Sequence, residues 1–402
     1  MVFSATKVLS LPGTVPILLL LSDPIIRSMR PIQMVDTKTQ YQKIKSEVDQ
    51  AVLDVMNSSA FINGQPVRDF TAALSSYLSV KHVIPCANGT DALQIAMMAL
   101  DLQPGDEVIT PSFTYIASTE VIALLRLKPV FVEVDGQTFC MDPVSLRNAI
   151  TPRTKAIVPV HLYGQAAPME EIMKVAAEFG LYVIEDNAQA IGCDFKFGDG
   201  VKKKTGTIGH IGCTSFYPSK NLGAFGDGGA LFTNDDVLAA KINMIANHGQ
   251  SKRYYHDVVG CNSRLDTIQA AILQIKLKHL DAYTEARQRA ANFYDRAFAS
   301  CSALTIPGRA SYTTHVFHQY TLLVEGKSRD QLSAYLSEKQ VPSMIYYPVP
   351  GHRQKMFATG GANMPALPVT DWLTERVISL PIHTELDEEQ LTHITTSVLS
   401  FM

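Results

Sequence analysis

The chain has 402 residues, of which 46% are hydrophobic and 18% are charged, and its formal net charge is −3. This length suffices for two domains with a large core, and the composition is that of an ordinary globular protein. Without a long basic run, nucleic acid and anionic membranes are poor candidates as partners. The six cysteines are widely spaced and contain no C-x-x-C pair, so we expect no disulfide framework, no metal site and a reducing cytoplasmic location.

Residues 1–28 form an extension that differs from the rest of the chain. Lys7 precedes an apolar run, Val8–Leu21, which Pro12 and Pro16 interrupt. A cation followed by an apolar run is typical of the start of a secretory signal, but no clear cleavage site follows. The run is also too short to span a bilayer. Two interpretations stay open: a mis-assigned start codon, which we favour, and a targeting segment.

From residue 41 to residue 233, predicted helices alternate with predicted strands. Apolar residues at three- and four-residue spacing indicate the helices, and short apolar runs indicate the strands. The predicted helices are Tyr41–Val55, Val67–Leu78, Ala92–Leu100, Pro143–Ala149 and Met169–Phe179. The predicted strands are His82–Cys86, Val108–Pro111, Pro129–Asp135, Lys155–Leu162, Tyr182–Asp186 and Gly229–Thr233. Such alternation predicts an α/β fold with a mostly parallel, doubly wound sheet.

The remaining pattern predicts a change of architecture after Pro307, beyond a helix that joins two domains. One long helix is expected from Thr267 to Phe298, and shorter units follow it. These units are a strand at Val316–Val324, a helix at Arg329–Glu338 and a final helix from Asp387. We therefore expect a large domain at residues 29–280 and a smaller C-terminal α+β domain at residues 281–402.

Polar residues follow several of the predicted strands, where open α/β sheets bind their ligands. Gly89 and Thr90 precede a predicted helix, whose free N-terminal amides attract a phosphate, although an ordinary helix cap explains the same residues. Tyr115 follows the next strand and is either a core aromatic or a ring-stacking residue. No GxGxxG follows the first strand and no GxxxxGK[ST] occurs, which removes the usual signals for dinucleotide and nucleoside-triphosphate binding.

Asp186 and Lys220 form the most specific combination in the sequence. Asp186 stands at the end of an apolar strand, and Lys220 lies among hydroxyls, a proline and several glycines. A desolvated lysine can attack a carbonyl, although an isolated lysine in such a turn is more often merely exposed. An aspartate that keeps a pyridine nitrogen protonated and a lysine that holds an aldehyde together suit pyridoxal 5'-phosphate (PLP).

With these residues in place, the chain resembles the DegT/StrS group of nucleotide-sugar aminotransferases, which are fold-type I PLP enzymes. The resemblance runs from about Met29 to the C-terminus. The segments that carry it most closely are Ala87–Gln94, Thr110–Tyr115 and Gly260–Asp266. It implies a large mostly parallel sheet domain, a smaller α+β domain, and Lys220 and Asp186 as catalytic residues.

The resemblance also implies which residues bind the cofactor. Gly89, Thr90 and Ser215 are expected at its phosphate and Tyr115 on the face of its ring. Gln189 is expected at the ring substituent beside the aldehyde. A further residue, Asn262, is expected to reach the cofactor phosphate of the neighbouring subunit, so the resemblance implies a homodimer with shared active sites.

For the substrates, the resemblance implies L-glutamate as amino donor and a UDP-linked 3-oxo sugar, 2-acetamido-3-oxo-glucuronate, as acceptor in surface polysaccharide or lipopolysaccharide biosynthesis. Arg264 is the candidate for the sugar carboxylate, because a guanidinium matches it bidentately; a salt bridge with Asp266 is the alternative. Tyr347 and His352 are candidate substrate contacts, and a stiff core loop explains them equally well. Tyr346 stands where relatives commonly have histidine, which leaves the sugar contacts open.

Three alternatives stay open at this point. The first is an aminotransferase for a 4-keto-6-deoxy nucleotide sugar, with the same chemistry on another acceptor. The second is a sugar dehydratase on the same scaffold, which Lys220 disfavours because the known dehydratase has histidine there. The third is a non-catalytic PLP-binding regulator, which the complete set of site residues disfavours.

Overall fold

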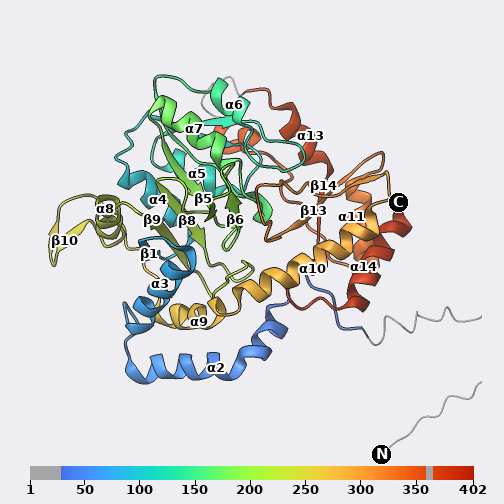
Figure 1. The fold of residues 1–402 in the computed structure, drawn as a ribbon, viewed down its shortest axis with the longest axis horizontal. Coiled ribbons are helices and arrows are strands. Elements are labelled where there is room, and N and C mark those ends of the chain that lie inside the picture. The colour runs from blue at the N-terminus through green and yellow to red at the C-terminus, as the bar shows by residue number, and fades with distance from the viewer. Residues whose placement is uncertain (1–28, 359–364) are drawn as a thin grey trace, which may run out of the picture. The chain divides into compact units, whose positions relative to one another are not determined.

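A seven-stranded sheet lies at the centre of the computed structural model, which describes residues 29–358 and 365–402 (Figure 1). Its strand order is β1-β9-β8-β5-β4-β2-β3. The bounds are β1 His82–Cys86, β2 Glu107–Pro111, β3 Lys128–Val132, β4 Thr154–Ile157, β5 Tyr182–Asp186, β8 Ile211–Ser215 and β9 Gly229–Thr233. Four neighbouring pairs are parallel, and β9 is antiparallel to both β1 and β8. The predicted mostly parallel sheet is confirmed, with β9 as its one reversed strand.

Helices cover both faces of this sheet, as a doubly wound fold requires. Packed on one face are α4 (Gly89–Ala99), α5 (Ala117–Leu124) and α8 (Asp236–Ala246). The other face carries α3 (Gln65–Leu78), α6 (Pro143–Asn148), α7 (Met169–Phe179) and α9 (Thr267–Leu277). A further helix, α2 (Thr37–Ser58), packs on α9 through Ile44 and Val48.

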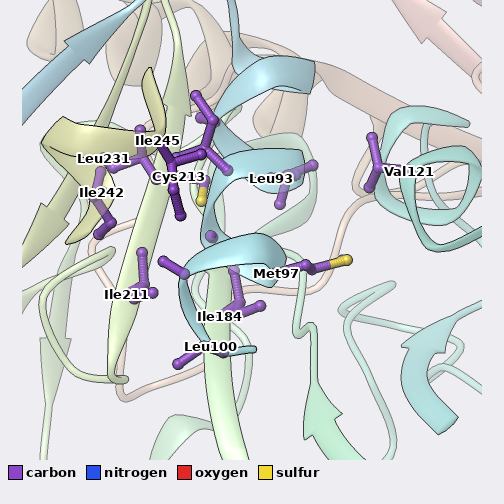
Figure 2. Packing of buried hydrophobic residues seen from close by; sticks show 14 of the residues in the cluster. Leu93, Met97, Leu100, Val121, Ile184, Ile211, Cys213, Leu231, Ile242 and Ile245 are labelled. Atoms are coloured by element: carbon purple, nitrogen blue, oxygen red, sulfur yellow. The ribbon is translucent and has the colours of Figure 1, made fainter. Parts of the chain in front are cut away.

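The buried cluster between α4 and the sheet shows why these segments fold together (Figure 2). Leu93 and Met97 of α4 are one turn apart and belong to the same cluster as Ile184 of β5, Leu231 of β9 and Val121 of α5. Along β5, Ile184 belongs to this cluster and Val183 to the cluster on the opposite face. Successive strand residues point to opposite faces, so both faces of β5 are apolar and only its end is polar.

Three predicted strands end or begin elsewhere than expected. The strand expected at Pro129–Asp135 ends at Val132. The strand expected at Lys155–Leu162 ends at Ile157, two residues before Pro159, which has no N–H for the ladder. The strand expected at Val316–Val324 begins only at Tyr320, because Phe317 adopts a left-handed backbone with φ +47° that no strand accommodates.

The single long helix expected from Thr267 to Phe298 is wrong. The structure has two helices, α9 and α10 (Leu280–Phe298), separated at Lys278 and His279. Tight i to i−3 bonds end α9 there, from Lys278 N–H to Ile275 O and from His279 N–H to Lys276 O. The apolar spacing continues across this break, so the periodicity alone did not reveal it.

A three-stranded sheet, ordered β12-β13-β14, occupies the C-terminal part, to which α10 leads (Figure 1). Its strands are β12 Leu304–Thr305, β13 Tyr320–Val324 and β14 Val377–Leu380. The helices of this part are α11 Arg329–Glu338, α13 Pro368–Arg376 and α14 Glu388–Phe401, whereas the short α12 (Lys355–Ala358) places Phe357 against Phe131 of β3. The domain boundary at 280/281 stays a prediction, because residues 32–402 form one compact unit. The extension 1–28 lies outside the described residues.

Two antiparallel ribbons lie outside the main sheets. One pairs β6 (Asp194–Lys196) with β7 (Lys202–Lys204). The other pairs β10 (Gln250–Lys252) with β11 (Tyr255–His256) and projects beyond α8 (Figure 1). All six cysteines are free. In the described part of the chain, no helix is long and apolar enough to cross a membrane, and no cluster of ligating side chains could hold a metal.

Candidate active site

The polar ends of β1, β5 and β8 meet at one edge of the seven-stranded sheet. The registers establish this: Asp186 of β5 pairs with Cys213 of β8, while Cys86 and Ser215 both pair with Gly229 of β9. A cavity of about 680 Å³ opens at this edge. Its walls include eight residues that the sequence singles out: Gly89, Thr90, Tyr115, Asp186, Gln189, Ser215, Lys220 and Tyr347.

Lys220 is presented to this cavity by a closed loop. The N–H of Ala224 donates to Phe216 O at 2.7 Å and so closes the loop, and the N–H of Lys220 donates to Tyr217 O at 2.8 Å. A side chain at Gly223 would lie 2.4 Å from Pro218 O, so only glycine fits this close approach. The turn that the glycines predict is thus a tight loop with Lys220 inside it.

Burial makes Lys220 a better nucleophile than an ordinary lysine. Desolvation penalises its charged form and lowers the pKa of Lys220 from 10.5 to about 8, while the nearby charge of Asp186 acts in the opposite direction. Attack on a carbonyl requires the neutral amine, and a substantial fraction of Lys220 is in this form at slightly alkaline pH.

Asp186 is held in place by two donors. Ser118 Oγ of α5 donates to Asp186 Oδ2 at 2.7 Å, and the N–H of Ala188 donates to Oδ1 at 3.1 Å. Both bonds fix the orientation of the carboxylate at the cavity wall. The arrangement suits a carboxylate that accepts a hydrogen bond from a protonated ring nitrogen.

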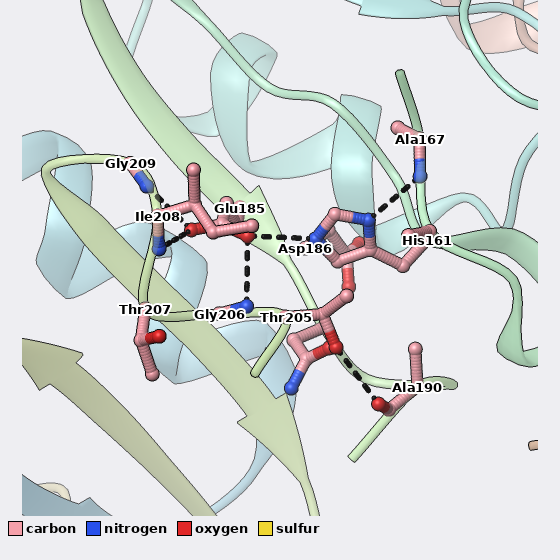
Figure 3. Close-up of polar contacts among 12 residues, drawn as sticks. His161, Ala167, Glu185, Asp186, Ala190, Thr205, Gly206, Thr207, Ile208 and Gly209 are labelled. Carbon is pink, nitrogen blue, oxygen red and sulfur yellow. Dashed lines mark hydrogen bonds and ion pairs between the residues drawn. The ribbon is translucent and has the colours of Figure 1, made fainter. Parts of the chain in front are cut away.

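Glu185, the neighbour of Asp186, points to the opposite face of β5 and is completely buried (Figure 3). Four donors surround its carboxylate at 2.6–2.8 Å: the N–H groups of Gly206, Ile208 and Gly209, and Nε2 of His161. The Nδ1 atom of His161 accepts a bond from Ala167 N–H, so Nε2 carries the proton. This network ties the end of β5, and therefore Asp186, to the segment that leads into β8.

The start of α4 provides a cradle for a phosphate. Asn88 caps the helix and satisfies the N–H groups of Asp91 and Ala92. In residues 29–358 and 365–402, the N–H groups of Gly89 and Thr90 have no such partner, as expected for the first turn. A Cβ at Gly89 would lie 2.7 Å from Cβ of Ser215, so this glycine permits the close approach of the serine. Two free amides, one hydroxyl and a helix N-terminus fit a phosphate group.

Tyr347 and Gln189 form one wall of the cavity. Gln189 Oε1 accepts a bond from Tyr163 N–H at 2.8 Å, and its Nε2 donates to the Tyr347 hydroxyl at 3.0 Å. The rings of Tyr115 and Tyr347 have centroids 6.0 Å apart, and Tyr115 is exposed toward the opening. The amide of Gln189 is therefore fixed, whereas the Tyr115 ring is free to meet a planar ligand.

Three predicted site residues lie elsewhere. Asn262 is exposed, and Arg264 lines a separate surface cavity with Lys241. No ion pair joins Arg264 to Asp266 or to another acid in the described part of the chain, which leaves its charge available. His352 is buried and bonded to Ser112 Oγ through its Nδ1 at 2.7 Å, which favours the core-loop alternative for this residue.

Sequence reasoning missed several residues at or behind the cavity. Ser118, which orients Asp186 from behind the cavity wall, lies inside a helix and carries no motif of its own. His318 and Gln319 line the cavity without having been singled out, and Tyr346, noted from the sequence only as a departure from relatives, also lines it. Burial and the positive charges of Lys220 and Arg287 hold the pKa of His318 well below its usual value, so its imidazole is neutral. Distance along the chain hides these contacts, because His318 follows Lys220 by almost a hundred residues.

The depressed pKa of Lys220 predicts a pH profile for its modification. In protein prepared without cofactor, the acylation rate of Lys220 should rise with pH and level off above about 8, because only the neutral amine reacts. Asp186→Asn should move the midpoint of this rate profile to lower pH, since it removes the charge that stabilises the Lys220 ammonium. Mass spectrometry of the Lys220 peptide measures both, and a midpoint near 10.5 would contradict the assignment.

The buried carboxylate network predicts a stability change. Glu185→Gln replaces an acceptor by an amide N–H that meets other donors, so the free energy of unfolding should fall by about 1–3 kcal/mol. The matched control is Glu178→Gln, which breaks an exposed pair with Arg147 and should leave stability unchanged. Urea unfolding compares the two, and equal midpoints would show that the network does not hold the strand end.

Comparisons with known proteins agree with this geometry. A family model described as the DegT/DnrJ/EryC1/StrS aminotransferase family matches residues 42–399. The UDP-N-acetyl-3-dehydro-α-D-glucosamine 3-aminotransferase of Acidithiobacillus ferrooxidans is 44% identical, over 91% of this chain and 97% of the relative. The UDP-2-acetamido-2-deoxy-3-oxo-D-glucuronate aminotransferase of Pseudomonas aeruginosa is also 44% identical, over 89% of this chain and 96% of the relative. A pleiotropic regulatory protein of Geobacillus stearothermophilus is also 44% identical, over 92% and 98%.

Solved structures give the same result. DesV of S. venezuelae, solved in complex with a ketimine intermediate, is 36% identical, with a TM-score of 0.88 over 93% of this chain and 99% of that chain. NtdA of Bacillus subtilis, solved with bound cofactor PMP, is 29% identical, with a TM-score of 0.82 over 94% and 83%. The match of sequence and structure covers both sheets and the whole cavity. The chain therefore belongs to the DegT/DnrJ/EryC1/StrS aminotransferase family.

Proposed function

We propose that this chain is a PLP-dependent aminotransferase that transfers an amino group from L-glutamate to the 3-oxo carbon of a UDP-linked 2-acetamido sugar. The observation that carries the proposal is the convergence of Lys220 and Asp186 on one cavity, with the pKa of the lysine lowered to about 8. Family membership supplies the reaction class, and the names of two 44% identical relatives support a 3-oxo UDP-sugar as acceptor.

The residues of the cavity divide the chemical work between them. Bound PLP supplies an aldehyde that accepts the amino group and a ring that accepts electrons. Lys220 would hold the aldehyde and, once free, would remove and return a proton as a neutral amine. Asp186, fixed by Ser118, would keep the ring nitrogen protonated. The amides of Gly89 and Thr90 and the hydroxyl of Ser215 would hold the phosphate, and Tyr115 would cover the ring.

We assign the acidic sugar, 2-acetamido-3-oxo-glucuronate, as the acceptor because of Arg264. Its guanidinium has no acidic partner in the described residues and matches a carboxylate in geometry. The second candidate is the neutral 3-oxo glucosamine derivative, which the equally similar Acidithiobacillus relative favours. The regulator alternative is also supported by a relative with 44% sequence identity, the pleiotropic regulatory protein of Geobacillus stearothermophilus. A purely regulatory protein, however, has no need of a lysine with a depressed pKa.

The placement of Arg264 and Asn262 outside the Lys220 cavity supports a homodimer with shared sites. Apolar side chains are exposed on α2 and on the segment after it (Leu53, Met56, Phe61 and Ile62) and on the β10–β11 ribbon and the segment after that (Tyr254, Tyr255 and Val259). Tyr254 is 78% exposed. Exposed aromatic and apolar side chains of this kind are enriched at interfaces between subunits. In such a dimer each subunit would supply Asn262 and Arg264 to the cavity of the other.

The choice of sugar can be tested by comparing acceptors. Wild type should use UDP-2-acetamido-3-oxo-glucuronate more efficiently than its neutral 3-oxo analogue. Arg264→Ala should lower kcat/KM for the acidic sugar on the order of 100-fold, the loss expected for a charge-assisted bidentate contact, and leave the neutral sugar nearly unchanged. An equal loss on both sugars would refute the carboxylate role, and a preference for the neutral sugar would select the second candidate.

Shared sites predict complementation between two inactive variants. Lys220→Ala should abolish turnover, and Arg264→Ala should be nearly inactive on the acidic sugar. When the two variants are unfolded together and refolded, each mixed dimer would contain one intact site. Random pairing places half of the chains in mixed dimers, so activity should return to about a quarter of the wild-type value. Each variant refolded alone is the control, and a mixture without activity would mean that both residues act within one subunit.

A further inference from the structure

The loop that carries Lys220 is attached to α9 at two points. Gln269 Oε1 accepts a bond from Phe225 N–H at 2.8 Å, and Lys276 Nζ donates to Gly223 O at 2.5 Å. The two α9 residues are seven positions apart, which is about two helical turns, so they lie on the same helix face. Gly223 and Phe225 stand at the closing end of the loop, three and five residues after Lys220.

Lys276 is an unusual residue for its position. Its side chain is 1% exposed, and its Nζ lies 5.3 Å from the centroid of the Phe225 ring. No carboxylate is within ion-pair distance in residues 29–358 and 365–402, so no salt bridge offsets the burial of this amine. Burial and the charge of Arg287 lower the pKa of Lys276 to about 8. A methionine or leucine could fill the same space without this desolvation cost.

The need of the Gly223 carbonyl for a hydrogen-bond donor explains why residue 276 of α9 is a lysine. Because Gly223 approaches Pro218 too closely for any side chain, the carbonyl has a fixed direction at the base of the loop. A buried carbonyl without a donor is costly, and a loop with an unsatisfied group tends to shift until the group finds one. The amine of Lys276 meets this need from α9, a helix that packs on α3 and on the sheet.

We propose that Lys276, together with Gln269, is a positioning residue that anchors the Lys220 loop to α9 and so aims the Lys220 amine into the cavity. Neither residue lines the cavity, so each acts through the loop backbone and touches neither cofactor nor sugar. The inference rests on the proposed function, because it assigns these residues to the capture of PLP by Lys220. A displacement of about 1 Å of a reacting group is enough to cost on the order of 100-fold in rate.

The test uses the full chain with Lys276→Met, Gln269→Leu and, as matched control, Lys278→Met at the exposed cap that directly follows α9. The first measurement is the rate at which cofactor-free protein captures PLP on Lys220, read by intact mass after borohydride reduction. The second is hydrogen exchange of the loop, residues 216–226, compared with that of α9. The third is the Tm of each cofactor-free protein.

Lys276→Met should capture PLP at least 10-fold more slowly than wild type, with faster exchange confined to the loop, and Gln269→Leu should show a smaller effect in the same direction. Lys278→Met should match wild type. A folded Lys276→Met that captures PLP at the wild-type rate would overturn the proposal, even if its Tm is lower. If that variant does not fold, an unchanged rate for Gln269→Leu overturns it. Wild type that captures no PLP would instead refute the proposed function.

Discussion

The parallel pairing of β5 with β8 is the constraint on which the site depends. It places Asp186 beside Cys213, so that Ser215 and the loop carrying Lys220 begin at the same sheet edge as the aspartate. A shift of one residue would turn Asp186 to the other face and bring Glu185 toward the cavity. The four donors around Glu185 oppose this shift, since they would lose their acceptor. The network behind the strand therefore protects the geometry in front of it.

Buried charge is used in two different ways around this cavity. Glu185 is surrounded by donors, so it serves as a fixed structural point. Neither Lys220 nor Lys276 forms an ion pair in the described residues, and burial lowers the pKa of each to about 8. For Lys220 this desolvation produces a neutral amine at moderate pH. For Lys276 the same cost is offset by a bond to a loop carbonyl that few other side chains could reach.

Sequence reasoning predicted the regular parts of the fold well and the long-range contacts poorly. The strands His82–Cys86, Tyr182–Asp186 and Gly229–Thr233 match the observed bounds, because apolar runs between turn residues define them locally. The break at Lys278 and His279 leaves no mark in the apolar spacing, and the left-handed Phe317 has no residue preference that announces it. Ser118 was invisible for a related reason: its partner Asp186 lies 68 positions away, and only the folded sheet joins them.

Addition of L-glutamate to the purified protein loaded with PLP tests the central claim most directly. If Lys220 and Asp186 form an aminotransferase site, the visible absorption of the bound cofactor should disappear as 2-oxoglutarate is released in equal amount. Addition of 2-oxoglutarate should then restore it, because the half-reaction is reversible. A protein that binds PLP but shows no change with L-glutamate or another amino donor would contradict the account and identify the chain as a binding protein.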